Sequence, residues 1–217
     1  DAQVGDDFHI NPEEIETKYY GVLTKIFNIA RFASQFDAPI DLESPPNLEI
    51  EDVWILAEFD ATLSIVQNAW ENIDIYTAAQ TIKAFGTGIF PSHWLEMSKS
   101  RLYEGNESAT WALHRIVRDL MSAFTPICPF FTHYLSTTLY SSSSTDVREF
   151  PRIPPACGAD QFNELRSLTD HLESFNSMVW KSKKDLGISL KSPISGIVLP
   201  EILSPFAITL TQMHNLE

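Results

Sequence analysis

Apolar side chains recur every three or four positions along most of this chain. That is the pattern of helices that each bury one face. Val53, Leu56 and Phe59, for example, fall on one side of the helix expected over about 51–69. The expected helices cover about 12–36, 51–69, 74–85, 91–103, 107–124, 129–140 and 161–185. The pattern therefore predicts a mainly α fold.

Proline, glycine and serine interrupt this pattern and divide the chain. Three prolines predict a loop over 37–47, and a run of four serines predicts another at 141–144. More prolines over 151–158 indicate a boundary, and an extended segment is expected at about 194–199. We predict a leader at 1–12, an antiparallel helix bundle at 13–150 and a small, partial C-terminal α+β subdomain at 151–217.

Composition fits a folded domain and excludes several classes of protein. The 217 residues are 44% apolar, which suffices for a packed core. No apolar run approaches the roughly 18 residues that span a bilayer, and the acidic first residues do not form a signal or transit peptide. Because position 1 is Asp rather than Met, we expect the chain to be part of a longer protein.

The two cysteines, Cys128 and Cys157, do not form a CxxC pair. This argues against a structural zinc site, and we expect two free thiols in a reducing cytoplasm. The six histidines do not pair at metal-ligand spacing, so no metal site is predicted.

The net charge of −14 argues against a protein that binds nucleic acid over its whole surface, but it permits a local basic patch. Within the first expected helix, Lys25, Asn28 and Arg31 are spaced three residues apart and form one polar ridge. A cation, an amide and a guanidinium in a row can hold phosphates and bond a base edge. The alternative is a solvated ridge on a core helix.

A second cationic group follows Trp180, with lysines at 181, 183 and 184. Near the end of a helix these lysines complement the helix dipole, and they would equally suit an RNA phosphate chain. Lys99 and Arg101 form a weaker patch, although they could instead pair with Glu96 and Glu104 on their own helix.

No catalytic group is predicted. Met97–Ser100 spells Met-Ser-Lys-Ser, which is also the core of an ATP-binding signature found on mobile loops of class I aminoacyl-tRNA synthetases. Here the tetrapeptide lies inside a continuous helical pattern, without a His-x-Gly-His partner or a βαβ pattern around it. Gly86–Gly88 predicts a turn rather than a phosphate cradle.

Five segments of the chain carry motifs in a fixed order: KIFNIARF at 25–32, WLEMSKSRLY at 94–103, FTPICPFFT at 124–132, REFP at 148–151 and KDLGISL at 184–190. Together they resemble the anticodon-binding region of class I aminoacyl-tRNA synthetases for aliphatic amino acids, most closely that of the valyl-tRNA synthetase family. The corresponding motifs of that family are K-L-W-N-A-x-R-F, Y-L-E-x-x-K-x-R-L-Y, L-A-P-F-x-P-F-x-T-E-E, W-P and K-x-x-x-G-I-S-L.

The second of these motifs accounts for Met-Ser-Lys-Ser as a coincidence. The chain departs from the family pattern at Phe27, where Trp is usual, and at His133 and Tyr134, which replace paired glutamates.

The resemblance implies a fragment that performs no chemistry and holds no cofactor. Its parent would be a valine–tRNA ligase that uses ATP and Mg²⁺, with catalytic and editing domains upstream in the same chain. The implied partner is the anticodon stem-loop of tRNA, with no DNA and no membrane.

From the helix geometry and the family's mode of binding, we expect Asn28 to bond a base edge, Lys25 and Arg31 to contact phosphate or base, and Phe32 or Phe36 to stack. Further candidate contacts are Lys99, Arg101, Lys181 and Lys184. Two alternatives stay open: the same domain of an isoleucyl-tRNA synthetase, and a non-catalytic acidic helical module that binds proteins.

Overall fold

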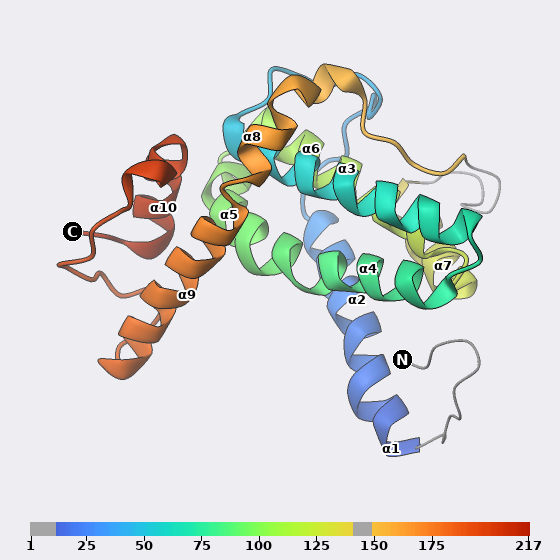
Figure 1. Ribbon diagram of the computed structural model, residues 1–217, viewed down its shortest axis with the longest axis horizontal. Helices are drawn as coiled ribbons and strands as arrows, with labels where there is room; N and C mark the ends of the chain where they lie inside the picture. Colours follow the sequence, from blue (N-terminus) through green and yellow to red (C-terminus); the bar gives the residue numbers. More distant parts are fainter. Residues whose placement is uncertain (1–11, 141–148) are drawn as a thin grey trace.

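The computed structural model describes residues 12–140 and 149–217 (Figure 1). Most of the expected leader, the serine loop at 141–144 and Arg148 lie outside the described residues. The elements of the bundle are α1 (Pro12–Glu14), η1 (Ile15–Tyr19), α2 (Tyr20–Ala33), α3 (Ile50–Glu71), α4 (Ile75–Thr87), η2 (Phe90–Trp94), α5 (Leu95–Tyr103), α6 (Glu107–Phe124) and α7 (Pro129–Tyr140). The later elements are η4 (Pro155–Cys157), η5 (Ala159–Gln161), α8 (Phe162–Arg166), α9 (Thr169–Asp185), η6 (Glu201–Phe206) and α10 (Ala207–His214).

Several helices begin where local side-chain chemistry favours a start. The Asp74 carboxylate accepts the backbone N–H of Thr77 at 3.0 Å and caps α4. The Asn106 amide oxygen likewise accepts the N–H of Ala109 at 2.8 Å and caps α6. Between α5 and α6 the chain turns at Gly105, whose φ of 77° favours glycine. These boundaries agree with those predicted from the sequence.

Helix α3 is the centre of the bundle and packs against α4, α6 and α8. A series of aromatic rings runs through the core, with centroid distances of 4.7 Å for Phe59–Phe85, 5.7 Å for Phe85–Phe90 and 5.4 Å for Phe90–Trp94. These rings are buried, so they fix α4 and η2 on α3. The predicted mainly α bundle is confirmed.

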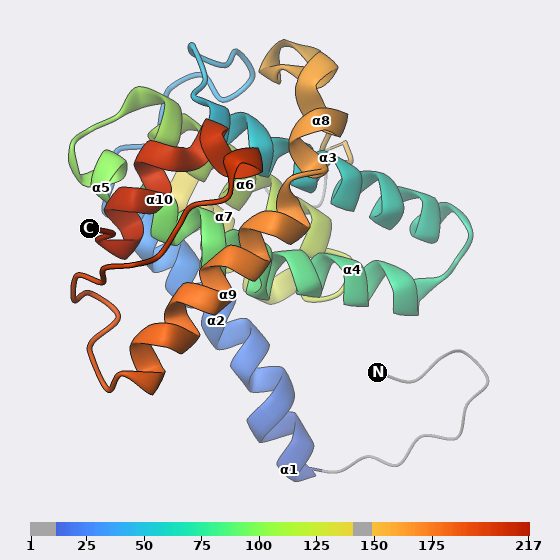
Figure 2. The same cartoon turned by 60° about the vertical axis from the view of Figure 1, so that its left-hand side comes forward.

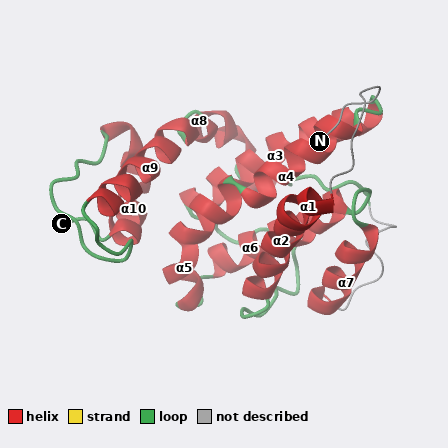
Figure 3. Cartoon of the chain, turned by 90° about the horizontal axis from the view of Figure 1, so that it is seen from below, coloured by secondary structure: helices red, strands yellow, loops and turns green. Residues whose placement is uncertain are grey.

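The C-terminal piece, defined here as residues 169–217, lies at one end of the molecule, and α7 lies at the other (Figures 1 and 3). Helix α2 crosses the bundle, and its N-terminal turns project beyond it (Figure 2).

Hydrogen bonds from α3 hold the C-terminal piece in place. The Trp54 indole donates to the Thr169 hydroxyl at 2.9 Å, and that hydroxyl donates to the Glu58 carboxylate at 2.6 Å. The buried Thr209 hydroxyl donates to Glu51. The seam between the two parts is therefore partly polar.

The structure corrects three expectations about the elements. The first expected helix is interrupted after α1 by a wider π-helical turn, η1, and ends at Ala33. The expected helix over 161–185 is two helices, α8 and α9. No described residue lies in a strand longer than one bridge, so the expected α+β character of the C-terminal subdomain is wrong.

The segment expected to be extended makes only one parallel bridge, between Ile194 and Leu216. Gly196 has a φ of 79° and Pro200 follows, so the chain leaves the bridge before a ladder can form. The subdomain instead ends in η6 and α10. The sequence pattern missed α10 because its eight residues are too few to show a clear helical period. Leu203, Phe206 and Leu210 are fully buried, which shows that tertiary packing holds this end of the chain.

Candidate nucleic-acid interface

Helix α2 presents the predicted polar ridge to solvent. Lys25, Asn28 and Arg31 are all exposed, whereas Ile26 and Ile29 between them are buried in the core. Because the apolar residues bind the helix to the bundle, the ridge side chains are not needed to hold the fold. The predicted face is confirmed, and RNA contact by these side chains stays a prediction.

A groove of about 700 Å³ opens beside this ridge. One wall comes from α2, η2 and α5, and the other from the C-terminal piece. Its charged lining residues are Lys25, Lys99, Lys191 and Glu96. Three lysines and one carboxylate give this groove a local positive excess in a chain whose net charge is −14. That is the local basic patch that the composition permitted.

The groove also contains an amide and aromatic surface. Asn28 and Phe32 line it from α2, and Trp180 lines it from α9. The ring of Phe32 meets that of Phe36 edge-on, with centroids 5.2 Å apart, and both rings contact Tyr103 of α5. Phe32 is therefore held at the groove, while Phe36 faces a second hollow.

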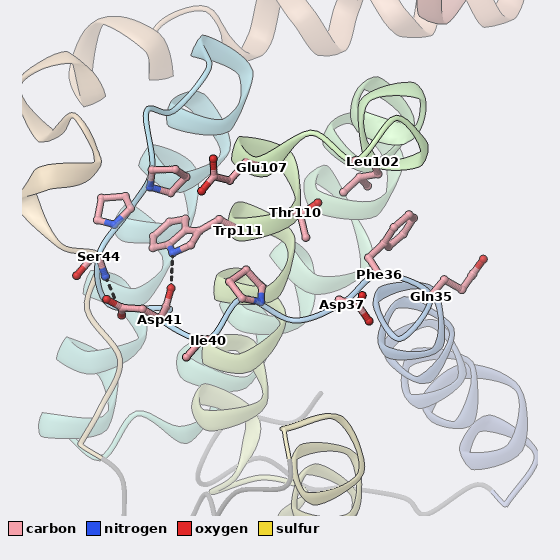
Figure 4. Close-up of a pocket in the computed structure, with 14 residues that line it drawn as sticks. Gln35, Phe36, Asp37, Ile40, Asp41, Ser44, Leu102, Glu107, Thr110 and Trp111 are labelled. Carbon is pink, nitrogen blue, oxygen red and sulfur yellow. Dashed lines mark hydrogen bonds between the residues drawn. The ribbon is translucent and has the colours of Figure 1, made fainter.

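The second hollow, of about 740 Å³, lies between the loop after α2 and the start of α6 (Figure 4). The Trp111 indole donates to the Asp41 carbonyl oxygen at 3.1 Å and forms part of its wall. Its charged lining residues are all acidic: Asp37, Asp41 and Glu107. Hydrogen bonds from the Ser44 side chain and from the backbone N–H groups of Glu43 and Ser44 lower the pKa of Asp41, so this carboxylate is charged at neutral pH. Phe36, which was predicted to stack on a base, lines this hollow, but the negative charge of the hollow should repel RNA phosphates.

The structure places the two candidates on α5 in different surroundings. Lys99 lines the groove and pairs with Glu96 at 2.5 Å, as the alternative for this residue predicted. Arg101 turns to the bundle interior, where its guanidinium donates to both oxygens of the fully buried Asp52 at 2.7 and 2.8 Å. It also bonds Glu49 at 3.1 Å rather than the expected Glu104. We therefore leave Arg101 out of the proposed RNA surface.

The lysines after Trp180 likewise separate into two kinds. Lys181 and Lys184 are exposed on α9 but do not line the groove. Lys183 is fully buried, which no local pattern predicted. The groove instead holds Lys191, which is not among the contacts predicted from the sequence and lies in an irregular segment without helical periodicity.

A buried hydrogen-bond network lies behind Trp180. The Asn176 amide nitrogen bonds His93 Nδ1 at 2.9 Å, and its amide oxygen accepts from His214 Nε2 at 2.7 Å. Burial lowers the pKa of His93. Burial, together with the charge of Lys183, lowers the pKa of His214 to about 4. Both rings are therefore neutral at neutral pH and serve as hydrogen-bonding groups that join η2, α9 and α10.

In residues 12–140 and 149–217, no group of three or more His, Cys, Asp or Glu side chains is placed to hold a metal ion. No described helix is both long and apolar enough to cross a membrane. Met97–Ser100 lies within α5, and Met97 and Ser98 are buried, which does not fit a mobile ATP-binding loop.

Comparison with known proteins identifies the family of this chain. The family model for the anticodon-binding domain of tRNA ligase matches residues 52–198. The valine–tRNA ligase of Aeropyrum pernix is 30% identical over 215 residues, which cover 95% of this chain and 25% of that protein. That of Saccharolobus solfataricus is 29% identical over 195 residues, which cover 90% of this chain and 23% of that protein.

The chain thus spans about a quarter of the length of the curated relatives that it matches. Since the family model covers well over half of its residues, the chain belongs to the anticodon-binding domain family of tRNA ligases.

Proposed function

We propose that this chain binds the anticodon stem-loop of tRNA as one domain of a cytoplasmic valine–tRNA ligase. Catalytic and editing domains elsewhere in the same protein would use ATP and Mg²⁺ to load valine onto the tRNA. In this proposal residues 13–150 form the anticodon-binding bundle, 151–217 a partial C-terminal subdomain, and 1–12 a leader from the catalytic part. Support for valine comes from the relatives, which are valine–tRNA ligases.

The observation that carries the proposal is the groove beside α2. It places an amide, an aromatic ring and cations within one open site. Proteins read unpaired RNA loops by stacking bases on aromatic rings and bonding their edges. Asn28 can both donate to and accept from a base edge, and Phe32 supplies a ring. Lys25 and Lys99 can bind the flanking phosphates. Lys99 would then leave its ion pair with Glu96 and bind RNA instead.

Arg31 lies one turn beyond Asn28 on the same exposed face of α2, outside the groove. We propose that it contacts a phosphate next to the base held in the groove.

The first test compares two RNAs on this 217-residue chain. Binding of a tRNA with a valine anticodon is measured beside the same tRNA with an isoleucine anticodon, over a series of salt concentrations. Preference for the valine anticodon supports the proposal, and preference for the isoleucine anticodon supports the isoleucyl alternative. Binding through several phosphates should weaken steeply with salt.

Asn28→Ala tests the base contact itself. Loss of a base-edge contact of about 1–3 kcal/mol should weaken binding of the valine tRNA and reduce the preference between the two anticodons. The matched control is Asn163→Ala, because Asn163 is an exposed asparagine on α8 outside the groove. Equal effects of the two substitutions would contradict the role given to Asn28.

The acidic second hollow and the net charge favour one competing function, a module that binds a basic protein. The same experiment separates the two. If neither RNA binds at low salt, the interaction module becomes the better explanation.

A further inference from the structure

The groove has a second wall, and its residues come from the C-terminal piece. Trp180 lines it from α9, Leu190 and Lys191 from the segment after α9, and Met213 from α10. These residues face Lys25 and Asn28 of α2 across one open space. The bundle alone therefore does not form the groove.

The segment that carries Lys191 is held by Lys183. The buried Lys183 ammonium donates to the carbonyl oxygens of Leu190, Ser192 and His214, each at 2.7 Å. An ammonium has three protons, and here all three are given to main-chain oxygens. Two of these oxygens belong to the residues on either side of Lys191. The main chain on both sides of Lys191 is thus fixed to α9, while the Lys191 side chain remains exposed.

Trp180 is fixed from two directions as well. Its ring lies against His93 of the bundle at 5.5 Å and against His214 of α10 at 5.8 Å. Asn176 bonds both of these histidines, so the ring is supported by a closed set of contacts behind it. An aromatic surface held in this way can receive a base or a ribose without rearrangement.

We infer that the C-terminal piece forms the second half of the RNA site, with Lys191 binding a phosphate, Trp180 giving an apolar wall, and Lys183 acting as a positioning residue for Lys191. This inference rests on the proposed function. Charge complementarity supports RNA as the occupant, because the lysines come from both walls and converge on a groove with a single carboxylate, Glu96. In so acidic a chain, such a groove fits a polyanion better than a basic or neutral partner.

The test begins with Lys191→Ala, measured by tRNA binding over a salt series. Loss of one phosphate contact should reduce the slope of log affinity against log salt by about one. Lys184→Ala is the matched control. Lys184 was predicted from the sequence as a contact, but it is an exposed lysine of the C-terminal piece that does not line the groove, so the site proposed here does not include it. Lys184→Ala should change the slope much less.

Lys183→Met tests the positioning role through a double-mutant cycle. If Lys183 holds Lys191 in the groove, Lys183→Met should reduce the salt slope, and adding Lys191→Ala should then reduce it no further. A purely structural Lys183 would lower stability while Lys191→Ala kept its full effect. Should Lys183→Met fail to fold by circular dichroism, Lys191→Ala against Lys184→Ala decides whether the second wall binds RNA.

The outcomes separate this inference from the proposed function. If the unchanged chain binds tRNA and Asn28→Ala weakens it, but Lys191→Ala and Lys184→Ala behave alike, then the second wall is not part of the site and this inference fails alone. If the unchanged chain binds no tRNA, the proposed function fails and this inference fails with it.

Discussion

Basic side chains gather in two regions of this molecule, and they face different surroundings. In the bundle interior, the Arg115 guanidinium donates to the carboxylates of Asp119 and Glu43 and to the carbonyl oxygens of Leu42 and Arg152, at 2.6–2.7 Å. Arg101 is likewise enclosed, mainly by Asp52. In the groove, the lysines project into open space with one carboxylate among them.

The two regions differ in how many hydrogen-bond acceptor oxygens surround the basic side chains. Arginine presents five donors in a planar fork, and the bundle supplies enough carboxylate and carbonyl oxygens to occupy most of them. The groove leaves its lysines few protein oxygens, which suits cations that bind a ligand. The oxygens around a basic residue, rather than its place in a motif, thus separate the structural residues of this chain from those of the proposed RNA site.

Arg101→Ala is the substitution with the largest expected effect, and it tests whether Arg101 belongs to the structural group. It would leave the fully buried Asp52 without its main charge partner, which should lower the free energy of unfolding by about 3–5 kcal/mol. Urea unfolding measures this, with Lys99→Ala on the same helix as the control, expected to change stability by less than about 0.5 kcal/mol. A stable Arg101→Ala protein that has lost tRNA binding would show that Arg101 belongs to the RNA site after all.

The second prediction concerns the buried groups directly behind the groove. The pKa of His214 is about 4 in the folded chain and 6.5 ordinarily, so between these values the unfolded chain binds more protons. Stability should therefore fall as pH falls from about 6.5 to 4, with His214 contributing on the order of 3 kcal/mol. The cause is that protonation would place a charge in a buried site beside Lys183.

This is checked by unfolding in urea at several pH values. His214→Gln keeps a donor for Asn176 but cannot titrate, so the difference in stability between it and the unchanged chain should shrink as pH falls. His171→Gln, at an exposed histidine of α9, controls for the substitution itself. If His214→Gln has the same pH dependence as the unchanged chain, His214 is not the group responsible.

The smallest effect on stability is expected from Lys25→Ala, which tests the other side of the comparison. The Lys25 ammonium makes one long hydrogen bond, 3.4 Å, to the Thr87 carbonyl oxygen. The substitution should therefore change the free energy of unfolding by less than about 0.5 kcal/mol. The slope of log tRNA affinity against log salt should fall by about one. Lys181, a contact predicted from the sequence, does not line the groove and is outside the proposed site, so Lys181→Ala should leave that slope nearly intact. A loss of stability above 1 kcal/mol would assign Lys25 to the fold instead.

Local signals in the sequence predicted the bundle well. Asp74 and Asn106 are side-chain caps, and they precede amphipathic segments whose apolar stripes meet in the core. The same periodicity placed Lys25 and Asn28 on the exposed face of α2. Such predictions succeed because they depend on residues within one or two helical turns.

Contacts across the fold could not be predicted in this way. Arg101 and its partner Asp52 are 49 residues apart, and Lys183 bonds an oxygen of His214, 31 residues away. Lys183 and Lys184 are equivalent in any local pattern, yet one is buried and the other exposed. Helix α10 was missed for a related reason, because its buried side chains rather than its intrinsic propensity stabilise it.

The polar seam between α3 and the C-terminal piece has a consequence for cooperativity. Hydrogen bonds such as Trp54 to Thr169 and Thr209 to Glu51 are directional, unlike apolar contacts, which tolerate sliding. A partly displaced C-terminal piece would leave several of these buried groups unpaired at once, and each unpaired group costs free energy. The seam therefore favours two states, fully docked or released, over a continuum between them. The groove, which needs both walls, is then either complete or absent in any one molecule.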